Sequence, residues 1–139
     1  MLCFVCTFSV CGFSQTVINE RVVTVEITNV TINGGQVILA IFTNPEEFRK
    51  EEPGIIFVLP DNSTVISREL TLPHGEYVVT AFQDSNNNNT MDFGLFGIPK
   101  EPFGISNYEG KGFPSRNFDR QKITVNGTTR KINIGLYRL

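Results

Sequence analysis

Apolar and polar residues alternate with a period of two along most of the chain, a pattern typical of half-buried β-strands. Val23, Val25 and Ile27 share one face of the first such segment. Residues 36–43 are apolar on both faces, as expected of a central strand that is covered on both sides. Further strands are predicted over residues 54–59, 64–72, 76–82, 121–125 and 130–137. The pattern therefore predicts an all-β protein of about seven strands.

Turn signals separate these segments and favour antiparallel neighbours. Asn33-Gly34-Gly35 supplies residues that tolerate a positive φ, and Asn126-Gly127 predicts a hairpin between the last two strands. One helix is indicated over residues 44–50, with Asn44 as its cap and Pro45 at its first position. Together the elements predict an antiparallel β-sandwich with one short helix.

Length and charge limit the function classes that need to be considered. The chain has 139 residues, enough for one domain, which we place at residues 15–139. Its formal net charge is -2 and its basic residues are scattered, so a nucleic-acid partner is not expected. No apolar run reaches the length of a transmembrane helix.

The first 14 residues, MLCFVCTFSVCGFS, are uncharged and largely apolar. They resemble a secretory signal peptide that is cut before Gln15, although the usual basic residues at its start are missing. All three cysteines lie in this segment, so the mature chain would have no thiol and no disulfide. We expect export to the periplasm or the cell exterior. Lipoprotein anchoring through Cys11 and a buried first strand are the alternatives.

Between Phe82 and Gln121 the alternation stops, and Gly or Pro occurs every few positions. Long loops of this kind in compact domains are usually functional or disordered. Six aromatic residues lie in the stretch, and exposing all of them to water would be costly, so we predict an ordered loop with most of these rings buried. Any of residues 93–118 left at the surface could contact a protein or a carbohydrate partner.

The beginning of this loop carries oxygen-bearing side chains at every second position. Relative positions 1, 3, 5, 7 and 9 are Asp84, Asn86, Asn88, Thr90 and Asp92, with Thr90 able to offer its backbone carbonyl. This is the spacing by which loops of the EF-hand type wrap Ca²⁺. The sequence therefore predicts a calcium site of modest affinity, with a Kd of roughly 10⁻⁴ to 10⁻³ M.

Two positions depart from the calcium-loop pattern. Asn89 stands where glycine is usual, although asparagine tolerates left-handed geometry better than most residues. Leu95 stands where a bidentate glutamate is usual, so Glu101, Asp119 or water would complete the ligand shell. The alternative is an asparagine-rich hairpin tip that is held by side-chain-to-backbone hydrogen bonds and binds no ion.

Three segments of the chain together resemble a known family. They are Leu72-Pro73-His74-Gly75-Glu76-Tyr77, Ala81-Phe82-Gln83-Asp84 with its Asp/Asn loop, and the run from Gly97 to Asn107, GIPKEPFGISN. They are similar to the secreted bacterial family called domain of unknown function 2141. The resemblance implies a small exported β-sandwich, similar to transthyretin-like and immunoglobulin-like modules, and implies no activity.

We therefore expect a non-enzymatic exported module whose loop is ordered by calcium, with a role as an accessory for binding or adhesion. The first alternative is a purely structural module of the cell envelope without a ligand. The second is a hydrolase that uses Asp84, Asp92 or Glu101 as acid and base, which would need a pocket holding two carboxylates. His74, the single histidine, lies in a Pro-His-Gly turn, where a solvated side chain is expected.

Overall fold

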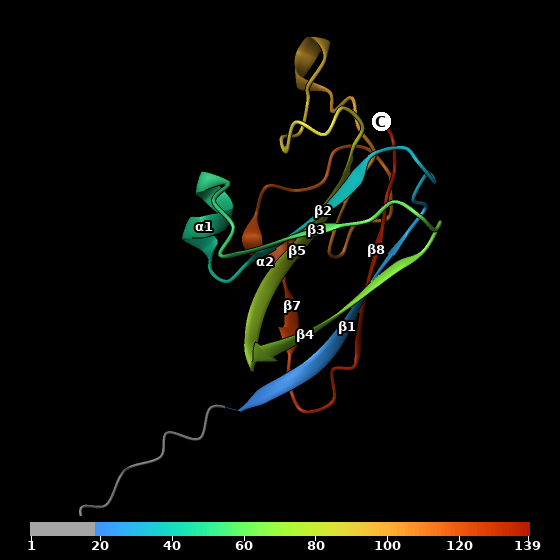
Figure 1. Cartoon of the computed structure of the whole chain (residues 1–139). Helices are drawn as coiled ribbons and strands as arrows, with labels where there is room; N and C mark the ends of the chain where they lie inside the picture. Colours follow the sequence, from blue (N-terminus) through green and yellow to red (C-terminus); the bar gives the residue numbers. More distant parts are fainter. Residues whose placement is uncertain (1–18) are drawn as a thin grey trace, which may run out of the picture.

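A computed structural model describes residues 19–139 (Figure 1). The strands of this part are β1 (Glu20–Thr28), β2 (Gln36–Phe42), β3 (Ile55–Leu59), β4 (Ile66–Pro73), β5 (Gly75–Asp84), β6 (Phe103–Ile105), β7 (Ile123–Val125) and β8 (Lys131–Gly135). Its helices are α1 (Pro45–Lys50), α2 (Phe118–Gln121) and a 3-10 turn, Leu95–Gly97. Within this range no helix has the length and apolar character that crossing a bilayer requires. The predicted signal segment 1–14, with Cys11, lies outside the described residues.

The eight strands of the described part form two sheets, which confirms the predicted all-β fold. The smaller sheet has the order β4-β1-β8. The larger sheet has the order β3-β2-β5-β6, and β7 pairs with the beginning of β5. The main core is made of side chains from both sheets, so the architecture is that of a β-sandwich.

Two details of the predicted topology are wrong. The last two strands do not form a hairpin, because β7 pairs with β5 in one sheet while β8 pairs with β1 in the other. The Asn126-Gly127 turn therefore carries the chain from one sheet to the other. As a result β8 enters the small sheet in the same direction as β1, and this pair is parallel in a fold that was predicted to be antiparallel.

Strand alternation explains the main core. Val23, Val25 and Ile27 of β1 are each 0% exposed, as their shared face predicts. They pack in one cluster with the inward residues of β2, among them Leu39 and Ile41. At about 25 cal/mol per Å² of apolar surface removed from water, this cluster is the largest stabilising feature of the fold.

A second apolar cluster covers the outer face of the larger sheet. Phe42 and Val78 on that face pack with Phe118 of α2, and Phe48 of α1 adds its ring at 5.2 Å from Phe42. The cluster explains why residues 36–43 are apolar on both faces, as predicted. Asn44 caps α1 as expected, since its side chain accepts a hydrogen bond of 2.9 Å from the Glu47 N–H. The second helix, α2, was not predicted.

Strand β5 links the body of the sandwich to the long loop. Near its start the Tyr77 hydroxyl donates a hydrogen bond of 2.7 Å to the carbonyl of Pro73, which secures the crossing from β4 to β5. Burial raises the pKa of Tyr77, so the neutral, donating form is favoured. At its other end β5 pairs with β2 as far as Asp84, which lies opposite Gln36. The Asp/Asn loop thus starts from a central strand.

Candidate metal centre

Asp84 is the last residue of β5 and is fully buried. Its Oδ1 accepts a hydrogen bond from the Asn88 N–H at 3.2 Å, and its Oδ2 accepts one from the Asn89 N–H at 2.7 Å. The Gln36 side chain donates to the same Oδ2 at 2.9 Å. The loop backbone therefore wraps around the carboxylate, which also connects the loop to the start of β2.

Left-handed backbone at two asparagines produces this tight wrap. Asn87 and Asn89 have φ values of 54° and 64°. Asparagine adopts such angles more easily than most residues, as expected for the position where calcium loops usually have glycine. Both asparagine side chains also reach Gln36: Asn87 Oδ1 accepts from its N–H at 3.1 Å, and Asn89 Oδ1 accepts from its Nε2 at 2.6 Å.

Asp92 lies across the loop, and two asparagine amides point at its carboxylate. Asn86 Nδ2 lies 2.6 Å from Asp92 Oδ2, and Asn88 Nδ2 lies 3.0 Å from Oδ1 and 3.2 Å from Oδ2. Asn88 therefore contacts both carboxylates, through its backbone N–H at Asp84 and through its side chain at Asp92. Asp84, Asn86, Asn88 and Asp92 are thus connected by hydrogen bonds within the loop.

Glu101 closes the base of the loop and is 3% exposed. Its Oε1 accepts a hydrogen bond from the Ser85 N–H at 2.9 Å, and its Oε2 accepts one from the Asp92 N–H at 3.2 Å. One buried carboxylate thus holds together the two ends of the Asp/Asn loop. Glu101 was one of the two acids predicted to complete a ligand shell, and it lies at the base of the Asp/Asn loop.

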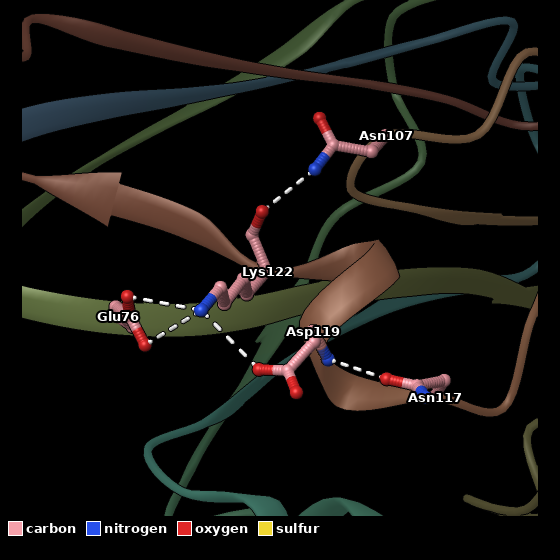
Figure 2. A network of polar contacts seen from close by, with 5 residues as sticks. All are labelled: Glu76, Asn107, Asn117, Asp119 and Lys122. Carbon is pink, nitrogen blue, oxygen red and sulfur yellow. Dashed lines mark hydrogen bonds and ion pairs between the residues drawn. The ribbon is translucent and has the colours of Figure 1, made fainter.

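Asp119, the other acid considered for the ligand shell, has a different environment. Figure 2 shows its carboxylate beside the Lys122 ammonium, at 3.2 Å, with Glu76 on the other side at 3.1 Å. Hydrogen bonds from Lys122 to Glu76 and Asp119 raise the pKa of that lysine. Asp119 is therefore part of an exposed ion-pair network between α2 and β5.

The acids of the loop have no such cationic partner. In residues 19–139 no lysine, arginine or histidine nitrogen lies within 4.0 Å of the carboxylates of Asp84, Asp92 or Glu101. Buried charges in proteins are normally paired with an opposite charge or coordinate a metal ion. Here the observed partners are backbone N–H groups, side-chain amides and the Ser85 hydroxyl, so no cationic side chain of the described residues lies beside these acids.

The predicted ligands are brought together to different degrees. Asp84, Asn86, Asn88 and Asp92 are connected by direct hydrogen bonds, whereas Thr90 contributes only its N–H, which lies 3.0 Å from Asn88 Oδ1. In the described part of the chain no three acidic, histidine or cysteine side chains converge as a metal-binding group. A cation in this loop would therefore depend on amide and carbonyl oxygens as well as on carboxylates.

Sequence reasoning missed Gln36 as a member of this site. Its contacts with Asp84, Asn87 and Asn89 follow from the register of β2 against β5. Pattern analysis identifies both strands but cannot give the register in which they pair. Gly35, just before it, allows the close approach, because a Cβ at this position would lie 2.1 Å from the Asp84 carbonyl oxygen.

The rest of the long loop contains both buried and exposed rings. Phe103 and Phe118 are buried and Tyr108 is half-buried, whereas Phe93, Phe96 and Phe113 are 56%, 96% and 68% exposed. The expectation that most of these rings are buried is therefore wrong for half of them. Two hollows are lined by residues of β3 and β4 and by residues around Lys122 and Lys131. Neither is lined by Asp84, Asp92 or Glu101.

Fold and loop together define a small bacterial β-sandwich module with an acidic, asparagine-rich loop at one end. A family model described as "Uncharacterized protein conserved in bacteria (DUF2141)" matches residues 25–133, so the chain belongs to this family. No curated protein and no solved structure matches the chain significantly.

Proposed function

We propose that this protein is an exported, non-enzymatic β-sandwich module whose Asp84–Asp92 loop binds Ca²⁺. The observation that carries the proposal is the uncompensated charge: Asp84 and Glu101 are buried, Asp92 is half-buried, and no cationic side chain of the described residues pairs with any of them. A hard divalent cation with oxygen ligands would supply the missing positive charge.

The residues of the loop fit a calcium ion by donor chemistry. Asp84 and Asp92 supply charge, Asn86 and Asn88 supply amide oxygens, and Thr90 can supply its carbonyl. Both amides now direct Nδ2 at Asp92, so ion binding requires each to turn about its last side-chain bond and present Oδ1 instead. Two carboxylates within the motif are few, which supports a Kd in the range of roughly 10⁻⁴ to 10⁻³ M, typical of extracellular modules.

The N-terminal sequence supports the export part of the proposal. Residues 1–14 are uncharged and have small residues, Gly12 and Ser14, at positions −3 and −1 from the expected cut, and no cysteine follows them. Export through the cell membrane with cleavage before Gln15 explains both features. Acylation of Cys11 is the alternative route to the envelope. Mass spectrometry of the protein purified from its host distinguishes the two products, because the lipoprotein starts at Cys11 and carries the mass of its lipid, whereas the cleaved protein starts at Gln15.

The calcium site is tested by thermal unfolding of residues 15–139 in millimolar Ca²⁺ and in chelator. With a Kd of about 10⁻³ M and ten times that concentration of calcium, we expect the Tm to rise by roughly 5 °C. The double variant Asp84→Asn with Asp92→Asn is expected to lose this shift. Asp119→Asn is the matched control, because it removes an acid that is already paired with Lys122, and it should keep the full shift.

Mg²⁺ at the same concentration is a second control, since it demands a smaller octahedral site and should give a smaller shift. Equal melting curves for the wild type with calcium and with chelator would contradict the calcium proposal. The purely structural module would then be the better description of the protein.

A further inference from the structure

Just beyond the Asp/Asn loop the chain forms an apolar projection, residues 93–98, at one end of the sandwich. Figure 1 shows the gold segment with its 3-10 turn standing away from both sheets. Leu95 and Phe96 at its tip are 84% and 96% exposed, and Phe93 and Ile98 below them are 56% and 38% exposed. Large apolar side chains are rarely gathered in this way on a soluble domain unless they meet a partner.

Backbone hydrogen bonds hold the projection in a defined shape. The Gly94 N–H donates to the Ile98 carbonyl at 2.7 Å, and the Lys100 N–H donates to the Asp92 carbonyl at 2.8 Å. Phe93 and Pro99 form a β-bridge between these two contacts. The tip is thus a small hairpin, built on the residue at which the Asp/Asn loop ends.

The conformation of Phe96 is unusual for a bulky residue. Its φ of 61° lies in the left-handed region, which side chains of this size rarely adopt. Such backbone strain is found preferentially at ligand-binding and functional positions. The ring that this backbone carries is almost fully exposed to solvent.

Two basic residues flank the base of the projection. Lys100 is exposed, and its stem runs alongside Gly94, with Cε 3.5 Å from where a Cβ on that glycine would lie. The exposed Arg138 donates a hydrogen bond of 3.0 Å from Nη1 to the Lys100 carbonyl. Neither side chain forms an ion pair within residues 19–139. Asp92, whose carbonyl accepts from the Lys100 N–H, and the adjacent Glu101 both accept hydrogen bonds inside the loop through their carboxylates.

We propose that the tip Leu95-Phe96 inserts into an anionic lipid bilayer, with Lys100 and Arg138 at the level of the headgroups. The four apolar side chains expose on the order of 500 Å², less than the roughly 800 Å² that each partner contributes to a stable protein complex. A convex tip of this size needs no complementary pocket in a bilayer, and the two cations complement anionic headgroups. The tip residues are not among the predicted calcium ligands, so the bilayer proposal and the calcium proposal are tested by different variants.

Vesicle co-sedimentation of residues 15–139 tests the proposal. We expect binding to vesicles of phosphatidylglycerol and phosphatidylethanolamine that weakens roughly tenfold in Phe96→Ser and about a hundredfold in Leu95→Ser with Phe96→Ser. Lys100→Gln should weaken binding roughly fivefold. Val58→Thr is the matched control, because Val58 is 58% exposed on β3, and it should bind as the wild type does.

Insertion itself is read from tryptophan fluorescence, because the chain contains no tryptophan. Phe96→Trp should show a blue shift on adding vesicles and quenching by brominated lipid chains. Phe113→Trp, at a ring that is 68% exposed in another part of the loop, should show neither. No binding by the wild type, equal binding by the tip variants, or an unchanged spectrum at position 96 would each overturn the proposal.

Discussion

Two groups of acidic side chains in this protein have different partners: one group pairs with a lysine, and the other accepts hydrogen bonds from neutral donors. Glu76 and Asp119 share the ammonium of Lys122, and their side chains are 51% and 79% exposed. Asp84 and Glu101 are 0% and 3% exposed, and only neutral donors reach them. The first group is an ordinary surface network, whose contribution to stability is expected to be small. The second is held by neutral hydrogen-bond donors, with no cationic side chain of the described residues beside it.

The difference predicts which group depends on its surroundings. Solvent and salt ions screen the exposed network, and water hydrates any charge that loses its partner, so a substitution there should change the free energy of unfolding little. The buried acids are screened much less, and each one accepts hydrogen bonds from backbone N–H groups of the loop. Substitution in the loop should therefore affect folding, whereas substitution in the network should have little effect.

Asp84→Ala should show the largest effect of the comparison. It leaves the N–H of Asn89 without its acceptor and removes one of the two acceptors of the Asn88 N–H and of the Gln36 side-chain amide. We expect a loss of about 3 kcal/mol in the free energy of unfolding, measured by urea denaturation in chelator. Asp119→Ala in the same assay is the control, and an equal loss in both variants would remove the distinction between the two groups.

Glu101→Gln should have an intermediate effect. The amide keeps the shape of the side chain but can accept only through Oε1, so one of the two N–H donors, Ser85 or Asp92, loses its partner. We expect a loss of about 1.5 kcal/mol by urea denaturation. A variant as stable as the wild type would mean that the loop ends are held together by other contacts.

Lys122→Met should have the smallest effect, and its pH dependence identifies the cause. Glu76 and Asp119 raise the pKa of Lys122 above its ordinary value of 10.5. The stabilisation is therefore fully present below pH 10.5 and is lost as the pH rises through the higher folded-state pKa. The difference in Tm between wild type and variant should shrink over that alkaline range and also at high salt. A difference that is constant with pH would assign the effect to packing.

The sequence predicts the strands better than it predicts how they are connected. Alternation places β1, β2 and β5 nearly correctly, because their inward residues are buried by both sheets. It fails at Asn126-Gly127, where a strong hairpin signal instead joins strands of different sheets. Turn chemistry describes only the local bend, and the pairing partner of each strand is decided by burial of distant residues.

In the candidate site, too, the sequence predicts the local features but not the contacts between segments that are distant in the chain. Spacing alone predicts that Asp84, Asn86, Asn88 and Asp92 turn inward, because alternate residues of a tight loop share a side. Gln36 could not be predicted, since it reaches the loop only through the register of β2 against β5. The exposure of Phe96 could not be predicted either, because composition favours burial of aromatic rings, and a left-handed backbone reverses that preference locally.

The parallel pairing of β1 with β8 has a consequence for how the domain is made. Thr24 lies opposite Lys131, and Thr28 lies opposite Gly135, so the smaller sheet joins the beginning of the domain to residues more than a hundred positions later. Until those residues emerge from the ribosome, β1 has only β4 as a neighbour in its sheet, and a two-stranded ribbon is marginally stable in water. The smaller sheet should thus be completed only when the last strand has been synthesised.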